Sequence, residues 1–361
     1  MFYESVVGEI GGFTEKLMDD ESKELYDARF QYYFDKDEDV LQDRIMKIAP
    51  KYKDSFFCWG LSSYYSRHSQ YKGIPLVIFG AGNMGKTTIR TLSLLGKQID
   101  CVVDNSESVQ GKTVCGYTVE SPQVIKGKDC VVIVAVKWNQ QIGIYYQLLN
   151  LGVPEERILM HQEGGLYLDF GRQYFDVKEV APNRDGEIFV DAGCFNGKTS
   201  VNASKWANGM LKKVYAFEPD KNSMESCEVS LKSIGCEFEL FNYATWNKRE
   251  QVCFDIHENA GYGSKVVDNG GVWVEANSID NVIDGRPVTY IKLDVEGSEL
   301  KTLQGAISTI NRWRPKLAIS IYHKPEDIIE IPRFLETLEL GYKYYIRQYQ
   351  SRIFETTLYA I

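Results

Sequence analysis

Two acidic residues and one histidine in the second half of the chain stand where strands of a parallel sheet are expected to end. The segment YIKLDVEGSELKTLQGA (290–306) places Asp294 and Glu296 directly after an apolar run, and KLAISIYH (316–323) ends in His323. The carboxyl ends of parallel strands line the ligand crevice of an open sheet. Carboxylates and imidazoles accept protons from reacting hydroxyls. We therefore predict that Asp294, Glu296 and His323 are the catalytic residues.

The same three side chains leave two alternatives open. Asp294 alone could hold the amino group of a cofactor instead of accepting a proton. Together, Asp294, Glu296 and His323 could form a carboxylate–histidine site for Mg²⁺, an ion that makes a bound hydroxyl more acidic. No closely spaced ligand pattern such as H-E-x-x-H accompanies them, so the prediction assigns no metal.

A glycine turn upstream of these residues fits a cofactor site. In FVDAGCFNGKTS (189–200), Asp191 ends an apolar run, and Gly193 and Gly197 follow it in the pattern D-x-G-x-x-x-G before a predicted helix. Small residues let the backbone approach a ligand, and the first amides of the helix attract a carboxylate. This pattern is typical of enzymes that bind S-adenosylmethionine (SAM).

The ends of the next two predicted strands support the same cofactor. Glu218 in YAFEPD lies about 20 residues after the turn, where a carboxylate can accept the ribose hydroxyls of a nucleoside. The third strand ends at FNYATW (241–246), which is expected to border the adenine. The predicted SAM-binding residues are Asp191, Gly193, Cys194, Phe195, Asn196, Gly197, Thr199, Glu218, Pro219, Tyr243, Ala244 and Asp294.

These motifs together resemble the FkbM family of SAM-dependent methyltransferases. The matching segments are VDAGCFNGKTS, YAFEPD, YIKLDVEGSELKTLQGA and AISIYH, and the resemblance covers roughly residues 185–361. Its specific part is the block D-V-E-G-x-E-x-x-x-L-x-G-A. The resemblance implies an O-methyltransferase that acts on hydroxyls of sugars or secondary metabolites. Cys194 and Phe195 depart from the smaller or polar residues that the family commonly has in the turn.

A second glycine turn, nearer the start, matches two nucleotide-binding patterns at once. In IFGAGNMGKTTIR (78–90), the glycines fit the dinucleotide pattern G-x-G-x-x-G, and G-x-x-x-x-G-K-T fits a P-loop. A P-loop requires an acid on another strand to hold its metal, and CVVIVAVKW ends without one. Asp104 instead lies about 20 residues past the last glycine, as a ribose-binding acid does. The predicted accessory nucleotide site is Gly80, Gly82, Asn83, Met84, Gly85 and Asp104.

This first unit resembles the small Rossmann-like domain found at the front of some sugar acyltransferases. The resemblance covers the turn, the helix, the strand ending in Asp-Asn and a small hairpin, over residues 78–125. It implies either nucleotide-sugar binding or a scaffold role. Nicotinamide-dependent chemistry is a further alternative.

The alternation of apolar runs and helical patterns predicts an α/β protein with two tandem Rossmann-like, doubly wound sheets. The expected organisation is a helical segment (1–70) that packs on the following domain, a Rossmann-like accessory domain (71–165) and a methyltransferase domain (166–361). Two aromatic-rich strands at the end predict an antiparallel hairpin added to a class I methyltransferase fold. The glycine-rich loop at 257–277 is the expected substrate region, with Tyr262, Ser264 and Trp273.

Composition restricts the partners and the compartment. Among 361 residues, 50 acids outnumber 41 Lys and Arg residues, which gives a net charge of −9 and argues against nucleic acid or an anionic membrane as partner. The eight cysteines form no C-x-x-C pair and suit a reducing compartment, and no apolar run approaches the length of a membrane span. We expect a cytoplasmic protein that acts on a small-molecule or sugar substrate, with a homodimer possible.

The sequence therefore predicts a SAM-dependent O-methyltransferase. The main alternative is a nucleotide-sugar-binding or scaffold module whose methyltransferase lobe is inactive.

Overall fold

The computed structural model describes residues 12–48, 71–94, 96–160, 173–255, 265–266, 271–349 and 354–361. The chain forms two compact units. The small unit comprises residues 42–168 and 350–352, and the large unit comprises residues 1–41, 169–349 and 353–361. The predicted boundary after residue 165 lies outside the described residues, and the one after residue 70 lies at the edge of a described range.

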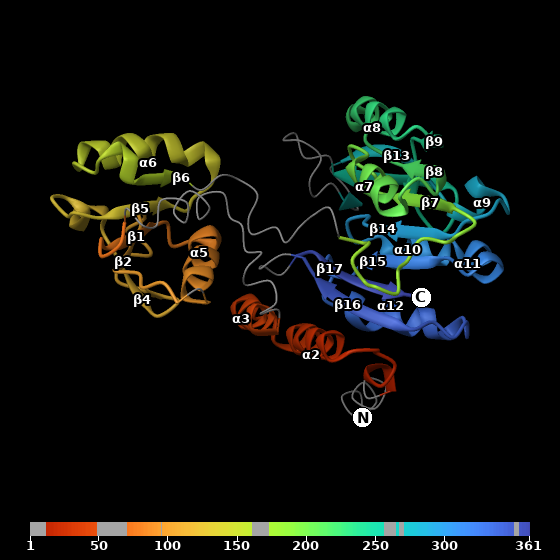
Figure 1. Cartoon of the computed structure of the whole chain (residues 1–361), viewed down its shortest axis with the longest axis horizontal. Coiled ribbons are helices and arrows are strands. Elements are labelled where there is room, and N and C mark those ends of the chain that lie inside the picture. The colour runs from red at the N-terminus through yellow and green to blue at the C-terminus, as the bar shows by residue number, and fades with distance from the viewer. Residues whose placement is uncertain are drawn as a thin grey trace. The chain divides into compact units, whose positions relative to one another are not determined.

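The small unit is built on a six-stranded sheet in the order β3-β4-β2-β1-β5-β6 (Figure 1). Every neighbouring pair is parallel except the edge pair β3–β4. Its strands are β1 (Leu76–Phe79), β2 (Cys101–Val103), β3 (Thr113–Val114), β4 (Tyr117–Glu120), β5 (Val131–Val134) and β6 (Ile158–Met160). Its helices are α3 (Glu38–Ile48), α5 (Asn83–Leu94), α6 (Trp138–Asn150) and the 3-10 turns η2 (Pro122–Ile125) and η3 (Glu155–Arg157).

Two neighbouring inner strands of the small unit, β1 and β5, consist entirely of buried aliphatic and aromatic residues. Strands covered on both faces have this continuous apolar pattern. The fully buried run VVIV of β5 therefore forms an inner strand of the sheet. Its four residues are too few for a buried helix.

The large unit contains a seven-stranded sheet in the order β16-β17-β15-β14-β7-β8-β9. The neighbours β15, β14, β7, β8 and β9 pair in parallel, whereas β17 runs antiparallel to both β15 and β16 and forms a hairpin with β16. The strands are β7 (Glu187–Ala192), β8 (Leu211–Phe217), β9 (Glu237–Phe241), β14 (Tyr290–Leu293), β15 (Lys316–Ser320), β16 (Tyr344–Gln348) and β17 (Thr356–Ala360). The predicted fold class, including the terminal antiparallel hairpin, is confirmed.

Helices and a second, smaller sheet complete the large unit. The helices are α2 (Asp20–Asp35), α7 (Lys198–Ala207), α8 (Lys221–Ile234), α9 (Ile279–Ile283), α10 (Glu299–Gln304), α11 (Ile307–Trp313) and α12 (Asp327–Thr337). The smaller sheet has the order β10-β13-β11-β12, with β10 (Ala244–Thr245), β11 (Glu250–Asp255), β12 (Lys265–Val266) and β13 (Val272–Asn277).

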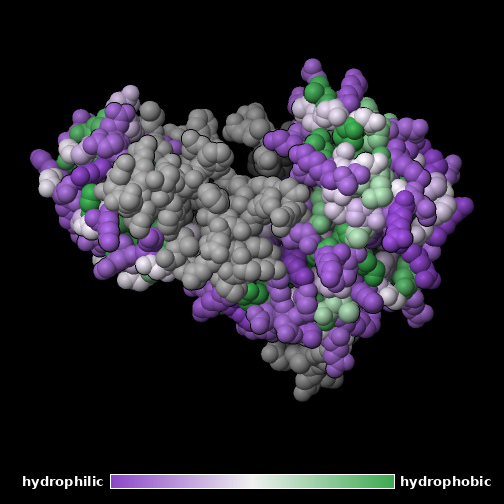
Figure 2. Space-filling view, viewed as in Figure 1, coloured by the Kyte–Doolittle hydropathy of each residue, from purple (hydrophilic) through white to green (hydrophobic). Residues whose placement is uncertain are grey.

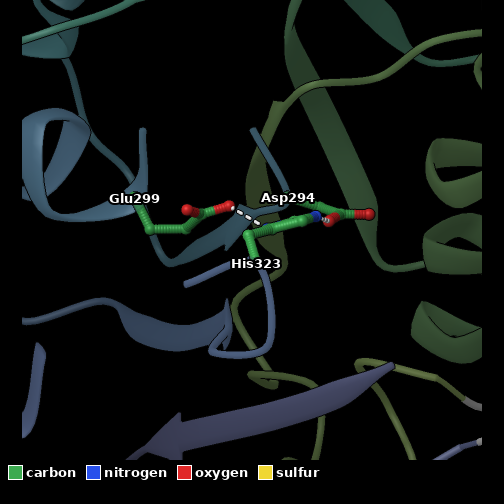
Figure 3. Close-up of side chains that lie close together, drawn as sticks. All are labelled: Asp294, Glu299 and His323. Atoms are coloured by element: carbon green, nitrogen blue, oxygen red, sulfur yellow. Dashed lines mark hydrogen bonds and ion pairs between the residues drawn. The ribbon is translucent and has the colours of Figure 1, made fainter. Parts of the chain in front are cut away.

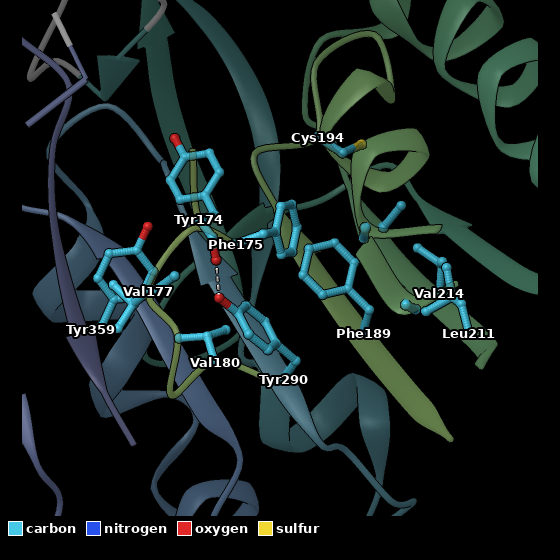
Figure 4. Close-up of a cluster of buried hydrophobic side chains, with 14 of the residues drawn as sticks. Tyr174, Phe175, Val177, Val180, Phe189, Cys194, Leu211, Val214, Tyr290 and Tyr359 are labelled. Carbon is cyan, nitrogen blue, oxygen red and sulfur yellow. Dashed lines mark hydrogen bonds between the residues drawn. The ribbon is translucent and has the colours of Figure 1, made fainter. Parts of the chain in front are cut away.

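Aromatic rings form the centre of the large unit's core (Figure 4). The Phe175 ring stacks on Trp206 at 5.2 Å between centroids and lies 5.7 Å from the ring of Tyr290. The buried Tyr290 hydroxyl donates a hydrogen bond to the carbonyl oxygen of Tyr174. These contacts attach the segment before β7 to the middle of the sheet.

The sequence predicted that the helical start of the chain packs as a whole on the following domain. Instead, its two described helices belong to different units. Helix α2 packs on β16 and α12 of the large unit. Its N-cap residue, Asp19, accepts hydrogen bonds from Ser22 N at 2.9 Å and from Arg347 Nη2 of β16 at 2.6 Å. Helix α3 instead belongs mostly to the small unit, where Asp43 pairs with Arg90 of α5 at 2.5 Å.

None of the helices in the described ranges combines the length and apolarity needed to cross a membrane. On the face shown in Figure 2, hydrophilic residues cover most of the described surface of each unit, and hydrophobic residues are scattered among them.

Candidate active site

The large sheet changes its strand order beside β7. Chain order runs from β7 through β8 to β9 on one side, whereas β14 and β15 lie on the other side. The crevice at the carboxyl ends of the strands on either side of such a switch point is where open α/β sheets bind ligands. Gly193 follows β7, Asp294 follows β14, and His323 lies three residues after the end of β15. The predicted catalytic and cofactor residues therefore converge on this edge.

The glycine turn after β7 requires its two glycines. Gly193 has a φ of +76°, and a Cβ atom there would lie 1.9 Å from the carbonyl oxygen of Asp294. Gly197 has a φ of +75°, and its Cβ would lie 2.8 Å from the Ser230 side chain. Both positions combine a left-handed backbone with close neighbours, which only glycine accommodates. The turn thus lies directly against the backbone that carries Asp294.

Asp191 lies behind this turn, fully buried. Its carboxylate accepts a hydrogen bond from Ser200 Oγ at 2.7 Å and pairs with Lys292 Nζ at 3.1 Å. Lys292 also donates to the carbonyl oxygen of Gly193 at 2.7 Å. Burial lowers the pKa of Lys292, but the charges of Asp191 and Asp294 outweigh it and raise that pKa above its ordinary value. Asp191 and Lys292 therefore hold the shape of the turn, and direct contact of Asp191 with a cofactor stays a prediction.

Glu218, after β8, fastens the turn from the other side. Its two carboxylate oxygens accept hydrogen bonds from Phe195 N at 2.8 Å and from Asp220 N at 2.9 Å. Burial raises the pKa of Glu218 to about 7, although the two amide donors oppose the shift. The side chain of Asn242 donates to the carbonyl oxygens of Glu218 and Pro219. Sequence reasoning missed Asn242, although the motif FNYATW contains it.

The remaining predicted cofactor residues divide by exposure. Phe195, Asn196, Thr199, Pro219 and Tyr243 are partly exposed around the turn. Cys194 is buried, and its Sγ lies 3.1 Å from Sγ of Cys227 on α8. Ala244 is buried in β10. The Cys194 side chain, which is larger than the residues common at this position of the turn, therefore packs into the core.

Asp294 and Glu296 meet His323 as the sequence predicted, and Glu299 joins them (Figure 3). His323 Nδ1 lies 2.8 Å from Glu299 Oε1, while its Nε2 lies 3.2 Å from Glu296 Oε2 and 3.6 Å from Asp294 Oδ1. Glu299 is completely buried. Burial lowers the pKa of His323, but the surrounding carboxylates, Glu299 first, raise it well above its usual value.

Two tyrosines support this acid–imidazole cluster, defined as Asp294, Glu296, Glu299 and His323. Tyr174 and Tyr322 donate hydrogen bonds to the two carboxylate oxygens of Asp294, at 3.0 Å and 3.3 Å. Tyr322 adjoins the histidine in the motif YH, whereas no local signal marks Tyr174, which comes from 120 residues away.

Glu296 has a left-handed backbone, with a φ of +54°. Such a conformation is unfavourable for a residue with a side chain by roughly 1–2 kcal/mol. The strained turn directs Glu296 to the side of the imidazole where Asp294 lies.

Of the three predicted substrate residues, Trp273 lies within the described part of the chain. Tyr262 and Ser264 lie outside the described residues. Trp273 on β13 has 65% of its surface exposed, so its ring is available at the surface of the smaller sheet.

In the small unit, close packing of the backbone accounts for most of the glycine turn at residues 78–90. A Cβ on Gly85 would lie 1.8 Å from the carbonyl oxygen of Gly80, so α5 must approach β1 closely. Asp104 accepts hydrogen bonds from Ala81 N and Ser106 N, both at 2.8 Å. Gly82 and Asn83 are exposed, and Met84 is partly exposed. The predicted nucleotide site stays a prediction.

Comparison with family models assigns each unit. Residues 191–344 match the model described as "Methyltransferase FkbM domain". The large unit carries an FkbM methyltransferase domain. Residues 74–159 match a model described as "C2185-like, N-terminal", so the sugar-acyltransferase resemblance of the small unit is not confirmed. No curated protein matches the chain significantly.

Solved structures similar to this chain include several methyltransferases. The methyltransferase FkbM from Methylobacillus flagellatus KT has 17% identity and a TM-score of 0.48, covering 90% of this chain and 98% of its own. A SAM-dependent methyltransferase from Aquifex aeolicus has 16% identity and a TM-score of 0.30, covering 53% and 93%. The Pyrococcus abyssi tRNA (uracil-54, C5)-methyltransferase, solved with S-adenosyl-L-homocysteine, has 15% identity and a TM-score of 0.26, covering 48% and 34%.

Proposed function

We propose that the FkbM domain is a SAM-dependent O-methyltransferase whose acceptor is a hydroxyl of a sugar, glycan precursor or small metabolite. One observation carries the proposal. The Asp294 backbone packs against Gly193 of the glycine turn, while the Asp294 side chain belongs to the acid–imidazole cluster. A methyl donor on the turn and a proton acceptor for the hydroxyl would therefore be neighbours at one sheet edge.

The residues around the turn fit SAM. The N-cap of α7 is Gly197, which has no side chain to bond to the first turn, although Lys198 N donates to Asn196 Oδ1 at 3.2 Å. The N-terminus of α7 therefore has partial positive charge that would attract a carboxylate. Glu218 is the acid that would accept the ribose hydroxyls. Each of its oxygens accepts one backbone hydrogen bond and retains a second lone pair. SAM would supply an electrophilic methyl group to the acceptor and leave as S-adenosylhomocysteine.

The acid–imidazole cluster would receive the proton that the hydroxyl loses as its oxygen forms the new O–C bond. Asp294 and Glu296 present partly exposed carboxylates, whereas His323 and Glu299 are almost or fully buried behind them. Burial raises the pKa of Asp294, but Lys292 and His323 outweigh it and lower that pKa. Asp294 is therefore an anion at neutral pH, available to orient and deprotonate the hydroxyl.

Two measurements test this function in sequence. Calorimetry with SAM is expected to show binding by the wild type and by Glu225→Gln, an exposed acid on α8. Glu218→Ala should bind much more weakly. A wild-type protein that binds no SAM would end the proposal.

Transfer of a labelled methyl group from SAM to a panel of hydroxylated sugars and metabolites then tests the chemistry. We expect transfer by the wild type and by Glu330→Gln, an exposed acid on α12, and a large loss in Asp294→Asn. If SAM binds and no acceptor is methylated, the result favours the alternative, a nucleotide-sugar-binding or scaffold protein whose methyltransferase lobe is inactive.

A further inference from the structure

We infer that Glu355 is a second proton acceptor of the active site. It takes up the proton that Asp294 receives from the substrate hydroxyl and releases that proton to water. Glu355 lies directly before β17 and is not among the site residues that the sequence predicted. The inference rests on the proposed function, because methyl transfer to a hydroxyl is the step that produces the proton.

The strand register brings Glu355 to the same sheet edge as Asp294. Strand β17 runs antiparallel to β15, so the start of β17 lies at the carboxyl end of β15. Ile321 N donates to the carbonyl oxygen of Thr356 at 2.9 Å, and Glu355 is the next residue toward Tyr322. Asp294 directly follows β14, on the other side of β15. The two carboxyl groups therefore flank the end of one strand.

A single buried segment contacts both carboxyl groups. The Gln173 side chain is only 3% exposed and donates to Oε2 of Glu355 at 2.5 Å. Its neighbour Tyr174 donates to Oδ2 of Asp294 at 3.0 Å. Glu355 has a left-handed backbone with a φ of +63°, and Tyr349 N donates to its carbonyl oxygen at 3.0 Å. Backbone strain of this kind is concentrated at functional sites.

Two buried hydroxyl groups lie along the strands between Asp294 and Glu355. By continuation of the register of β14 and β15, Ser320 lies opposite Asp294, and Thr357 of β17 is the partner of Ser320. Both side chains are completely buried, and Oγ1 of Thr357 has no hydrogen-bond partner in the described part of the chain. Buried polar atoms are nearly always bonded to protein or ordered water. Such hydroxyls can carry a proton from one carboxyl group toward the other.

The two carboxyl groups hold protons with different strength. Burial and the negative charges of Asp294 and Glu296 raise the pKa of Glu355 to about 7, against the hydrogen bond from Gln173 and the charge of His323. The pKa of Asp294 is lowered instead. A proton on Asp294 is therefore at a lower free energy once it reaches Glu355. Pairs of acids whose pKa values are driven apart in this way are typical of acid–base sites.

The transfer leaves every proton and electron pair accounted for. The substrate hydroxyl loses its proton to Asp294 as its oxygen forms the new O–C bond, and the electrons of the broken S–C bond remain on sulfur. Asp294 passes the proton to Glu355 and is again an anion for the next turnover. Glu355 is partly exposed and can release the proton to water.

Infrared spectroscopy of the full chain tests the pairing without a substrate, because a protonated carboxyl group has a C=O band that a carboxylate lacks. In the wild type and in Glu330→Gln, part of this band should disappear as the pH rises through about 7. Glu218 and Asp327 contribute to the same step, so the share of Glu355 is the component that Glu355→Gln lacks. Asp294→Asn, compared with its double variant that also has Glu355→Gln, should lower the midpoint of this share by about one pH unit.

The pH dependence of methyl transfer tests the route of the proton. Saturating SAM removes the influence of Glu218 on cofactor binding. Under that condition, kcat of the wild type should rise as the pH rises through about 7, because Glu355 becomes able to accept a proton. Glu355→Gln should remove this rise and lower kcat at pH 8 by at least about 10-fold. Glu355→Asp should recover part of both, and neither variant should change the affinity for SAM.

Three outcomes overturn the inference and leave the proposed function standing. One is a wild-type spectrum in which the Glu355 component keeps its midpoint after Asp294→Asn, since the two carboxyl groups then do not interact. The others are a kcat profile that Glu355→Gln leaves unchanged and an equal loss of kcat at every pH, which indicates a structural role. A wild-type protein that binds SAM and methylates no acceptor overturns the proposed function, and with it the source of the proton, whatever the infrared result.

Discussion

Nδ1 of His323 lies 2.8 Å from Oε1 of Glu299, a carboxylate with no exposed surface. This contact joins the end of β15 to the first residue of α10. It also fixes which nitrogen of the imidazole faces Asp294 and Glu296.

The first prediction concerns Glu299 as a positioning residue. Glu299→Gln should lower kcat for methyl transfer by about 10²-fold, because small misplacement of a reacting group has effects of this size. The affinity for SAM should be unchanged, since the glycine turn does not contact Glu299 through any described hydrogen bond. Steady-state kinetics and SAM calorimetry measure the two quantities separately. An equal loss of SAM affinity would assign Glu299 to general stability of the domain.

A second prediction follows from the pKa of Glu218, which burial raises to about 7 from an ordinary 4.5. The folded state therefore holds a proton that the unfolded state loses at lower pH, so this contribution to stability is complete below about pH 4.5. It disappears as the pH rises through 7.

Glu218→Gln should reduce the fall in the free energy of unfolding between pH 5 and pH 8. The fall should not vanish, because burial also raises the pKa values of Asp327 and Glu355 to about 7. Urea denaturation at both pH values measures the difference, and Glu225→Gln is the matched control. An unchanged difference in the Glu218 variant would contradict the prediction.

The third prediction concerns the N-cap of α2. Asp19→Ala should destabilise the large unit by about 1 kcal/mol through loss of the cap, whereas Asp20→Ala, at an almost fully exposed neighbour, should have little effect. Burial opposes the shift, but the hydrogen bonds from Arg347 and Ser22 lower the pKa of Asp19 to about 2 from 3.8. Its contribution is therefore present above about pH 3.8 and lost as the pH falls through 2. Denaturation curves for both variants check this; equal effects at the two positions would refute it.

A fourth prediction compares two glycines that share a left-handed backbone. Gly193→Ala combines an unfavourable φ with a Cβ 1.9 Å from the Asp294 carbonyl oxygen, whereas Gly209→Ala, with a φ of +84°, has no neighbour within 4 Å. Gly209→Ala should cost roughly 1–2 kcal/mol from backbone strain alone. Gly193→Ala should cost clearly more and abolish SAM binding, as thermal unfolding and calorimetry would show. Similar unfolding temperatures for the two variants would exclude a tight turn-to-β14 contact.

Much of the architecture was predictable because parallel strands leave a strong signal. Runs such as VVIV and YIKL are too short and too apolar for surface helices, and each is followed by the turn residues that mark a strand end. Since the carboxyl ends of parallel strands share one edge of the sheet, the sequence was enough to predict that Asp294 and Glu296 lie close to His323. The distance from Gly197 to Glu218 identified the second acid for the same reason.

By itself, the sequence determined the fold class, the two glycine turns and the three residues Asp294, Glu296 and His323. Only the tertiary structure decided the burial and the hydrogen-bond partners of the side chains around them. It buried Glu299 behind the histidine, brought Tyr174 to Asp294 and paired Asp191 with Lys292, and it placed α2 on β16 at the far end of the chain. These contacts join residues far apart in sequence, or they involve a helix residue, such as Glu299, whose side chain is buried. Local periodicity carries no information about either, because burial depends on which other elements pack against that face.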